Sequence, residues 1–264
     1  MNLTGHLSVL NRLIYYELIN YNEVDPLVVF FHDALGSVAQ WKDFPLQISK
    51  KLQLPCLVYD RHGHGLSEPS PLGKRTRKYL ENEAELCFKE LLKGLKINVP
   101  LILVGHSDGA TIALVASAEM QSKIIGTISI AGHVFLEDDA VTGIEETVRL
   151  YSKNAAGLRD KLAVFHGDKT DALFESWHSI WLSPEYREWN IVESLKNIAT
   201  PLLVIQGSDD EYATLDHPYI IQANVSGPSE VWIAEKCGHL PHKQLPEEIT
   251  SKIASFYSMN ISPN

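Results

Sequence analysis

Short, continuous runs of apolar residues recur along the chain, and they do not alternate apolar with polar positions. Such runs are typical of strands buried on both faces, as in a parallel sheet that helices cover on each side. A proline precedes several of the runs, where no donor to the neighbouring strand is needed. We therefore predict buried strands at residues 27–31, 55–59, 100–104, 124–131, 201–205 and 230–234.

Longer segments between these runs place apolar residues at three- and four-residue steps, which is the spacing of one face of a helix. They cover residues 37–52, 76–97, 108–120 and 244–258. Strands that alternate with helices predict a mostly parallel sheet with right-handed crossovers. Residues 7–21 instead indicate two strands that are split near Asn11 and form a hairpin at the edge of the sheet.

Residues 133–196 interrupt this alternation, because they have helical spacing but contain no convincing buried strand. They lie between the strands predicted at 124–131 and 201–205. We predict that this segment is a helical cap inserted over one end of the sheet. Residues 1–132 and 197–264 would then form a single α/β core domain.

Composition and charge narrow the class of protein. The 264 residues are 45% hydrophobic and 21% charged, as in an ordinary globular protein, and the formal net charge is −10. The basic residues at 74–78 are soon followed by Glu81, Glu83 and Glu85, so nucleic acid is not an expected partner. No apolar run reaches the ~18 residues that span a bilayer, and the three cysteines have no CxxC or metal spacing. We therefore expect a cytoplasmic protein with no membrane partner, metal or other cofactor.

Ser107 is the candidate nucleophile, at the centre of the motif Gly105-His106-Ser107-Asp108-Gly109. A G-x-S-x-G match is weak by itself, but this one follows a predicted strand and precedes a predicted helix. A serine on such a sharp turn has strained dihedral angles. Glycines two positions before and after it avoid clashes with the neighbouring strand and helix.

A serine hydroxyl needs a general base before it can act as a nucleophile. His239 follows the last predicted strand, directly after Gly238, whose flexibility would let the chain turn back over the sheet edge. His242 is the alternative. We favour His239 because His242 is already close to the final helix.

The base in turn needs a carboxylate that fixes its tautomer and stabilises the imidazolium ion. Asp209, Asp210 and Glu211 all follow the strand predicted at 201–205, and each could serve. We favour Asp210 and expect Asp209 to be a solvated turn residue or a helix cap. The chain order of serine, acid and histidine suits three groups at successive strand ends of one parallel sheet.

Together these motifs resemble the α/β-hydrolase superfamily over nearly the whole chain. The nucleophile elbow of the family aligns on Ser107, its acid on Asp210 and its histidine on His239. The turns that follow the third and fourth strands of the family resemble residues 32–37 and 60–67 here. The resemblance implies the α/β-hydrolase fold, a mostly parallel sheet flanked by helices, but specifies the substrate much less.

The resemblance also implies an oxyanion hole made by the backbone N–H groups of Ala34 and Asp108. Two residues depart from the common pattern. Asp33 stands where the family has glycine, and Asp108 places a carboxylate beside the nucleophile. We expect the Asp108 side chain to turn away from the oxyanion, at the start of the following helix, where a negative charge is favourable.

Candidate pocket residues come from the insertion. Trp177 and Trp181 are four residues apart and share one face of a predicted helix, and His133 follows the strand that borders the expected cleft. The insertion has 7 Lys and Arg residues against 12 Asp and Glu residues, a net charge of −5. This charge suits a neutral, fairly apolar small-molecule substrate better than a polyanion.

The sequence thus predicts a serine hydrolase that cleaves a small or medium carboxylic ester through an acyl-enzyme, with no cofactor. Two other reactions fit the same residues, namely thioester hydrolysis and carbon–carbon bond hydrolysis in a vinylogous diketone. A ligand-binding protein without turnover is the alternative from another class.

Overall fold

An eight-stranded sheet organises the protein, which is seen in a computed structural model that describes residues 2–21 and 26–262. Residue 1 and residues 263–264 of the predicted core lie outside the described residues, as do residues 22–25. The strands are β1 (Leu3–Val9), β2 (Arg12–Ile19), β3 (Leu27–Phe31), β4 (Cys56–Tyr59), β5 (Leu101–His106), β6 (Ile124–Ile130), β7 (Leu202–Gly207) and β8 (Ser229–Ala234).

The strand order is β1-β2-β4-β3-β5-β6-β7-β8. β1 and β2 form the predicted hairpin, β2 is antiparallel to β4, and the remaining neighbours are parallel. The predicted fold class, a mostly parallel sheet flanked by helices, is therefore confirmed. The prediction of burial on both faces holds for β3, β4, β5 and β7. It is wrong for β8, most of which is half-buried, because β8 is the last strand of the sheet.

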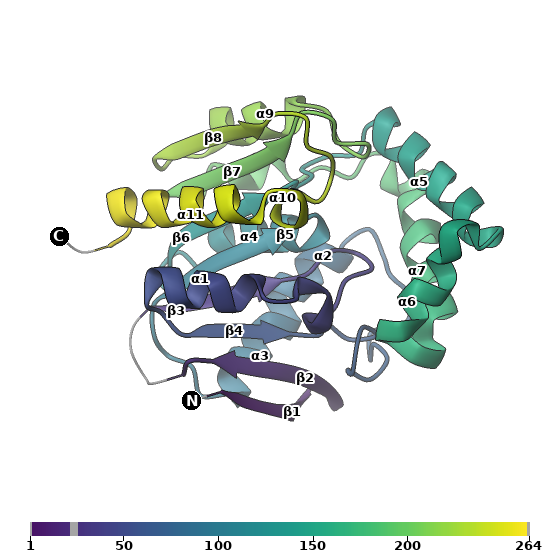
Figure 1. Ribbon diagram of the computed structural model, residues 1–264, viewed down its shortest axis with the longest axis horizontal. Coiled ribbons are helices and arrows are strands. Elements are labelled where there is room, and N and C mark those ends of the chain that lie inside the picture. Colours follow the sequence, from purple (N-terminus) through teal and green to yellow (C-terminus); the bar gives the residue numbers. More distant parts are fainter. Residues whose placement is uncertain (1, 22–25, 263–264) are drawn as a thin grey trace.

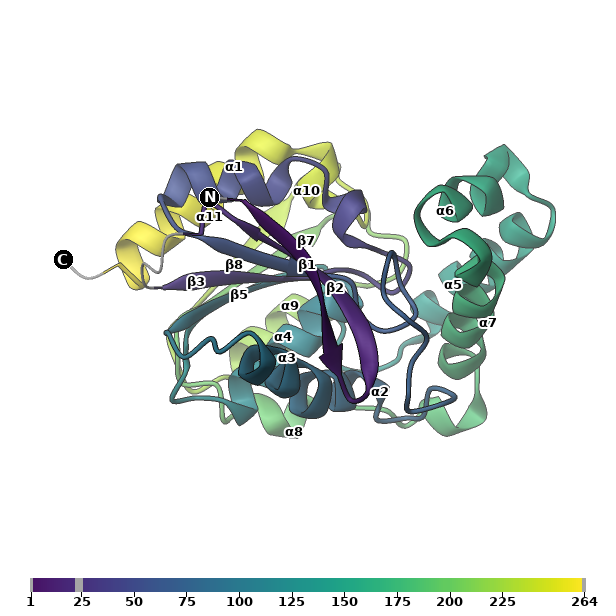
Figure 2. The same ribbon diagram turned by 90° about the horizontal axis from the view of Figure 1, so that it is seen from below.

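Helices cover both faces of the sheet. Those of the core are α1 (Phe44–Leu52), α2 (Tyr79–Asn82), α3 (Phe88–Gly94), α4 (Asp108–Glu119), α8 (Val192–Leu195), α9 (Asp216–Asn224), α10 (Pro241–Gln244) and α11 (Pro246–Asn260). α1 and α11 pack on one face, and α3, α4, α8 and α9 lie on the opposite face (Figure 2). Each face buries its own apolar cluster, which holds the helices onto the sheet.

The helix predicted at 108–120 forms, but it is not amphipathic. Every residue of α4 from Asp108 to Ala118 is buried. The reason is its position at the centre of the molecule, where α4 contacts β3, β5 and β6 on one side and α2 and α8 on the other. Its many alanines leave room for this close packing. A helix that is apolar on all sides is the expected result of burial on all sides.

The predicted insertion folds into helices α5 (Asp138–Ser152), α6 (Leu158–His166) and α7 (Thr170–Trp181), which form a separate layer at one end of the sheet (Figure 1). An isolated bridge between Phe135 and Asn190 joins its two ends. α8 falls within the predicted boundary of 133–196 but packs against α4 and α9. The packing therefore places α8 with the core helices.

None of the helices in residues 2–21 and 26–262 combines the length and the hydropathy that crossing a bilayer requires. The cytoplasmic location expected from the sequence stays a prediction, as do the expected absences of nucleic-acid and membrane partners.

Candidate active site

Ser107 occupies a strained turn between β5 and α4. Its backbone has φ 55° and ψ −121°, a conformation that residues with a side chain rarely adopt. A Cβ atom on Gly105 would lie 2.1 Å from the carbonyl oxygen of Gly109, and one on Gly109 would lie 2.0 Å from that of Phe31. The two glycines are therefore required for the strand and the helix to meet closely enough to form this turn.

The side chains of Ser107, His239 and Asp210 form a hydrogen-bonded row at the ends of β5, β8 and β7. Nε2 of His239 lies 2.9 Å from Oγ of Ser107. Nδ1 of His239 lies 2.8 Å and 2.9 Å from the two oxygens of the Asp210 carboxylate. Because the carboxylate accepts the Nδ1 proton, Nε2 is left to accept the proton of the serine hydroxyl.

Asp210, rather than its neighbour, is the acid that reaches the histidine. Its side chain is fully buried and also accepts hydrogen bonds from Nε2 of Gln206 (2.6 Å) and from the backbone N–H of Tyr212 (2.9 Å). Asp209 is exposed and accepts a hydrogen bond from the Ser208 hydroxyl. The structure thus places Asp210 against His239 and Asp209 at the surface.

The electrostatics of the row keep Asp210 ionised and make His239 more basic. Burial lowers the pKa of His239, but the charge and hydrogen bond of Asp210, together with the charges of Glu211 and Asp33, outweigh burial, so this pKa is raised above its usual value. For Asp210, burial raises the pKa, and His239 and the Tyr212 N–H outweigh it, so this pKa is lowered. An ionised carboxylate can therefore stabilise the imidazolium ion that proton transfer creates.

Glu211, the third candidate acid, has a different position. Its carboxylate accepts a hydrogen bond from the backbone N–H of His239 (3.1 Å).

The loop before His239 does not turn at Gly238. Its positive φ falls at Lys236, so the flexibility expected of Gly238 is not what turns the chain. A Cβ on Gly238 would lie 3.1 Å from the Glu211 carboxylate, so the glycine makes room for it.

His106 and His242, the other histidines near the row, have packing and hydrogen-bonding roles. Nε2 of His106 donates to the carbonyl of His239 at 2.7 Å and supports its backbone. His242 belongs to α10, and its ring packs against the rings of Trp41 and His106. Of these histidines, His239 is the one whose ring lies within hydrogen-bonding distance of Ser107.

The N–H groups proposed to hold an oxyanion belong to Ala34 and Asp108, which both line the cavity above Ser107. Asp108 is the first residue of α4, so its N–H has no acceptor within the helix. Asp33, where the family has glycine, shapes the other side of the hole. Its carboxylate accepts from the N–H of Leu35 (3.0 Å), which holds the turn that carries Ala34.

Arg61 contacts the peptide that carries the N–H of Ala34, and the sequence analysis did not identify it. It is buried, and its Nη2 donates at 2.7 Å to the carbonyl of Asp33, the same peptide unit that carries the N–H of Ala34. A cation on the carbonyl end polarises that peptide and makes its N–H a stronger donor. The only local signal was an arginine in the turn at 60–67, which by itself indicates no such contact.

The Asp108 carboxylate has partners of its own beside the nucleophile. It accepts a hydrogen bond from the Tyr79 hydroxyl (2.8 Å) and lies 3.7 Å from Nη2 of Arg61. Burial raises the pKa of Asp108, while Arg61, Arg75 and Tyr79 act in the opposite direction. These contacts hold the side chain on the side of Tyr79 and Arg61, consistent with the expected orientation.

A cavity of about 210 Å³ opens above Ser107 and His239, between the core and the cap helices. All three candidate pocket residues line it, namely His133, Trp177 and Trp181. Apolar side chains of α5 and α6 make up much of the remaining wall: Ala140, Ile144, Leu158 and Leu162. Burial lowers the pKa of His133 to about 3, so its ring is neutral and donates Nε2–H to the carbonyl of Tyr212.

Residues 28–251 match the sequence profile of the Alpha/beta hydrolase family. The chain belongs to this family. The α/β-hydrolase fold, the elbow at Ser107 and the order of the candidate residues along the chain agree with that membership. The family assignment supports a hydrolase, and the bond that it would cleave is a separate question.

Three curated proteins that are similar to this α/β-hydrolase have names that describe different reactions. The chain is 29% identical to 2-(acetamidomethylene)succinate hydrolase of Mesorhizobium japonicum, over 48% of this chain and 43% of that protein, so the match spans less than half of that relative. It is 22% identical to monoglyceride lipase of Rattus norvegicus, over 85% and 78% of the two chains. It is also 22% identical to 2-hydroxy-6-oxo-6-phenylhexa-2,4-dienoate hydrolase of Comamonas testosteroni, over 90% and 91%.

Proposed function

We propose that this α/β-hydrolase cleaves a small or medium, fairly apolar carboxylic ester through an acyl-enzyme. The observation that carries the proposal is the row Ser107–His239–Asp210, which opens into an apolar cavity. In the proposed reaction, Oγ of Ser107 attacks the acyl carbonyl carbon while Nε2 of His239 takes its proton. The leaving alcohol receives that proton as the ester bond breaks, and the acyl group stays on Ser107.

The second half of the reaction uses the same groups. His239 removes a proton from water, which attacks the acyl carbon, and the acid product leaves as Ser107 regains its proton. In both steps the N–H groups of Ala34 and Asp108 would stabilise the negative oxygen, each lowering the barrier by about 3 kcal/mol as in other enzymes. Asp210 stays ionised throughout and orients His239.

The cavity lining supports a neutral substrate. No Lys or Arg side chain is among its lining residues in the described part of the chain, whereas Asp33, Asp108 and Glu211 are. A substrate carboxylate would meet Asp33 and Glu211 without a cation to pair with it, whereas the Asp108 carboxylate is held toward Tyr79 and Arg61. The cavity volume of about 210 Å³ suits a small or medium acyl group. The similarity to a monoglyceride lipase also supports an ester, as that enzyme's name describes a lipid ester hydrolase.

A substrate panel tests the bond type. Neutral nitrophenyl esters, acyl thioesters and a vinylogous diketone acid are compared by kcat/KM, and a fluorophosphonate probe reports on Ser107. We expect labelling of Ser107 and the highest kcat/KM for the esters. Turnover restricted to the thioester or to the diketone would reassign the bond. A folded protein that neither labels nor turns over any substrate would favour the non-catalytic binding protein.

The pH dependence of ester hydrolysis should report on His239. Only the neutral imidazole can accept the serine proton, so kcat/KM should rise with pH as His239 loses its proton. Because Asp210 raises the pKa of His239, the midpoint should lie above the usual value of about 6.5. Initial rates from pH 5 to 9 measure this, and Asp209→Ala serves as a control that should keep the midpoint. A flat profile with chemistry rate-limiting would contradict the assignment of His239 as base.

A further inference from the structure

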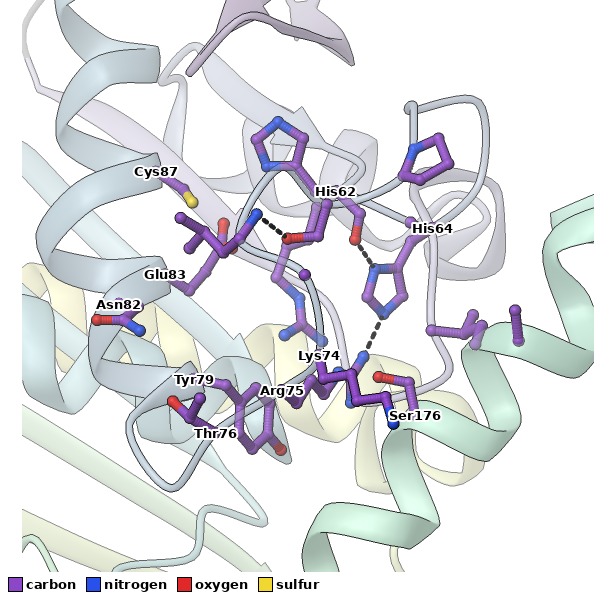
Figure 3. A pocket seen from close by; sticks show the side chains of 18 of the residues that line it. His62, His64, Lys74, Arg75, Thr76, Tyr79, Asn82, Glu83, Cys87 and Ser176 are labelled. Carbon is purple, nitrogen blue, oxygen red and sulfur yellow. Dashed lines mark hydrogen bonds between the residues drawn. The ribbon is translucent and has the colours of Figure 1, made fainter.

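A second cavity, of about 290 Å³, lies beside the catalytic one, and the proposed reaction does not use it. Its walls are the loop that follows β4, the helical segment at 79–87 and one side of α7 (Figure 3). Glu83 is the one acidic side chain among its lining residues in the described part of the chain. Basic side chains gather around the space: Arg61, His62, His64, Lys74, Arg75 and Lys169.

Arg75 forms no direct ion pair among the described residues, although the Asp108 carboxylate lies near enough to act on its charge. Its Nη2 lies 3.4 Å from Nε2 of His64, and its guanidinium lies 4.9 Å from the centre of the Tyr79 ring (Figure 3). Burial lowers the pKa of His64 well below its usual value, so that ring is neutral. Within residues 2–21 and 26–262, Arg75 takes part in no ion pair. Its Nη1 is also buried without a hydrogen-bond partner there.

Arg61 presents a second unused donor in the same lining. Its Nη2 donates to the carbonyl of Asp33 and lies 3.7 Å from the Asp108 carboxylate, but its Nε is buried and has no hydrogen-bond partner among the described residues. Buried donors that carry positive charge cost free energy when nothing accepts from them. Two guanidinium groups with spare donors in one cavity therefore favour an occupant that supplies negatively charged acceptor oxygens.

The basic residues at 74–78 are followed in the sequence by acidic residues, but these do not neutralise the positive charge of the cavity lining. Glu85 is exposed, and Glu83 accepts a hydrogen bond from the buried Tyr59 hydroxyl at 3.0 Å. The chain as a whole has a net charge of −10, so a cavity whose charged lining residues are Arg61, Lys74, Arg75 and Lys169 against Glu83 differs in sign from its surroundings. Such a cavity attracts anions that the rest of the surface repels.

The geometry points to a binding site for a small oxyanion, a carboxylate or a phosphate group, held by Arg75 and Arg61. The flat guanidinium fork matches the spacing of two oxygens in either group. The volume of the cavity is at the low end for ligand sites, so the occupant is small. The site is distinct from the catalytic cavity, because the two share no lining residue.

A wall of hydrogen-bonded side chains stands between the two cavities. The Tyr79 hydroxyl donates to Asp108 at 2.8 Å and accepts from Nε1 of Trp181 at 2.7 Å. Asp108 and Trp181 line the catalytic cavity, and Tyr79 lines the basic one. An anion bound at Arg75 would therefore lie across this wall from Ser107 and not in its reach.

Titration calorimetry with inorganic phosphate, and separately with malonate, tests the site at constant ionic strength. We expect one saturable site per chain for at least one of the two anions. Arg75→Gln should weaken that binding by at least about tenfold, because it removes a charge-assisted hydrogen bond. The matched control Lys78→Gln removes the same charge three residues away and outside the lining, and should change binding by less than about twofold.

The outcomes separate the sources of the anion. Saturation by phosphate alone assigns a phosphate ligand, and saturation by malonate alone assigns a carboxylate ligand. No saturable binding of either, or an equal loss in both variants, would overturn the proposal. If Arg75→Gln does not fold, Lys74→Gln replaces an exposed lining cation and should weaken binding more than Lys78→Gln does. The titration needs no turnover, so its result is independent of the proposed reaction.

Discussion

Replacing Ser107 by alanine should lower kcat for ester hydrolysis by about 10⁶-fold, as removal of the nucleophile does in other serine hydrolases. The variant keeps His239, Asp210 and the cavity, so it should still bind substrate, and any remaining rate would come from binding and the oxyanion hole. Steady-state hydrolysis of the best ester, with an active-site titration to exclude wild-type contamination, measures the effect.

The matched control is Ser129→Ala, which removes another buried serine hydroxyl, one without a hydrogen-bond partner among the described residues. It should leave kcat within a few-fold of the wild type, because such a hydroxyl contributes little when nothing bonds to it. Circular dichroism and melting curves of both variants separate misfolding from lost chemistry. Near-normal turnover in a folded Ser107→Ala protein would remove this serine from the reaction.

Replacing Asp210 by alanine should lower kcat by about 10⁴-fold, because His239 then loses the partner that fixes its tautomer and stabilises its charged form. Asp209→Ala changes the adjacent aspartate in the same way and should have little effect, since that side chain is exposed and bonded to Ser208. The comparison is made by kcat on the same ester. A large loss in Asp209→Ala together with a small loss in Asp210→Ala would show that the wrong carboxylate is assigned.

The Asp210 variant also needs a stability control, because its carboxylate has structural partners. Its removal leaves Nε2 of Gln206 and the N–H of Tyr212 without their acceptor, which should lower the free energy of unfolding by roughly 1–3 kcal/mol. Activity is therefore compared well below the melting temperature of the variant. Asp210→Asn preserves the shape of the side chain and should still be strongly impaired.

Local features of the chain were sufficient to predict the strands, the elbow at Ser107 and the order of the candidate residues. A buried strand is a run of apolar residues, and the elbow requires Gly105 and Gly109 because a Cβ there would collide with backbone. These requirements act between residues close in the chain, or on the whole face of an element. They therefore produce a recognisable pattern of residue types in the sequence. The amphipathic pattern assigned to 108–120 was wrong because neighbours on every side decide how a helix is buried.

The surroundings of the row could not be predicted in the same way. Arg61 on the Asp33 carbonyl, Tyr79 on Asp108 and Glu211 on the His239 backbone each join residues about 28 or 29 positions apart. No periodicity or motif specifies such a pair, because each contact depends on how whole elements pack. The same is true of Arg75. Glutamates follow it closely in the sequence, but in the fold Glu83 accepts from Tyr59, Glu85 is exposed, and Arg75 contacts His64.

The chain alone therefore determines which backbone turns can form and which residues can carry the chemistry, since steric limits and polarity are properties of each residue and its neighbours. Tertiary structure decides which of several equivalent side chains meet, such as Asp210 with His239. It also decides which buried donors have no partner among the described residues, such as Nη1 of Arg75. The reason is physical: hydrogen bonds and ion pairs act over a few ångströms in space, and only the folded packing brings distant residues within that range.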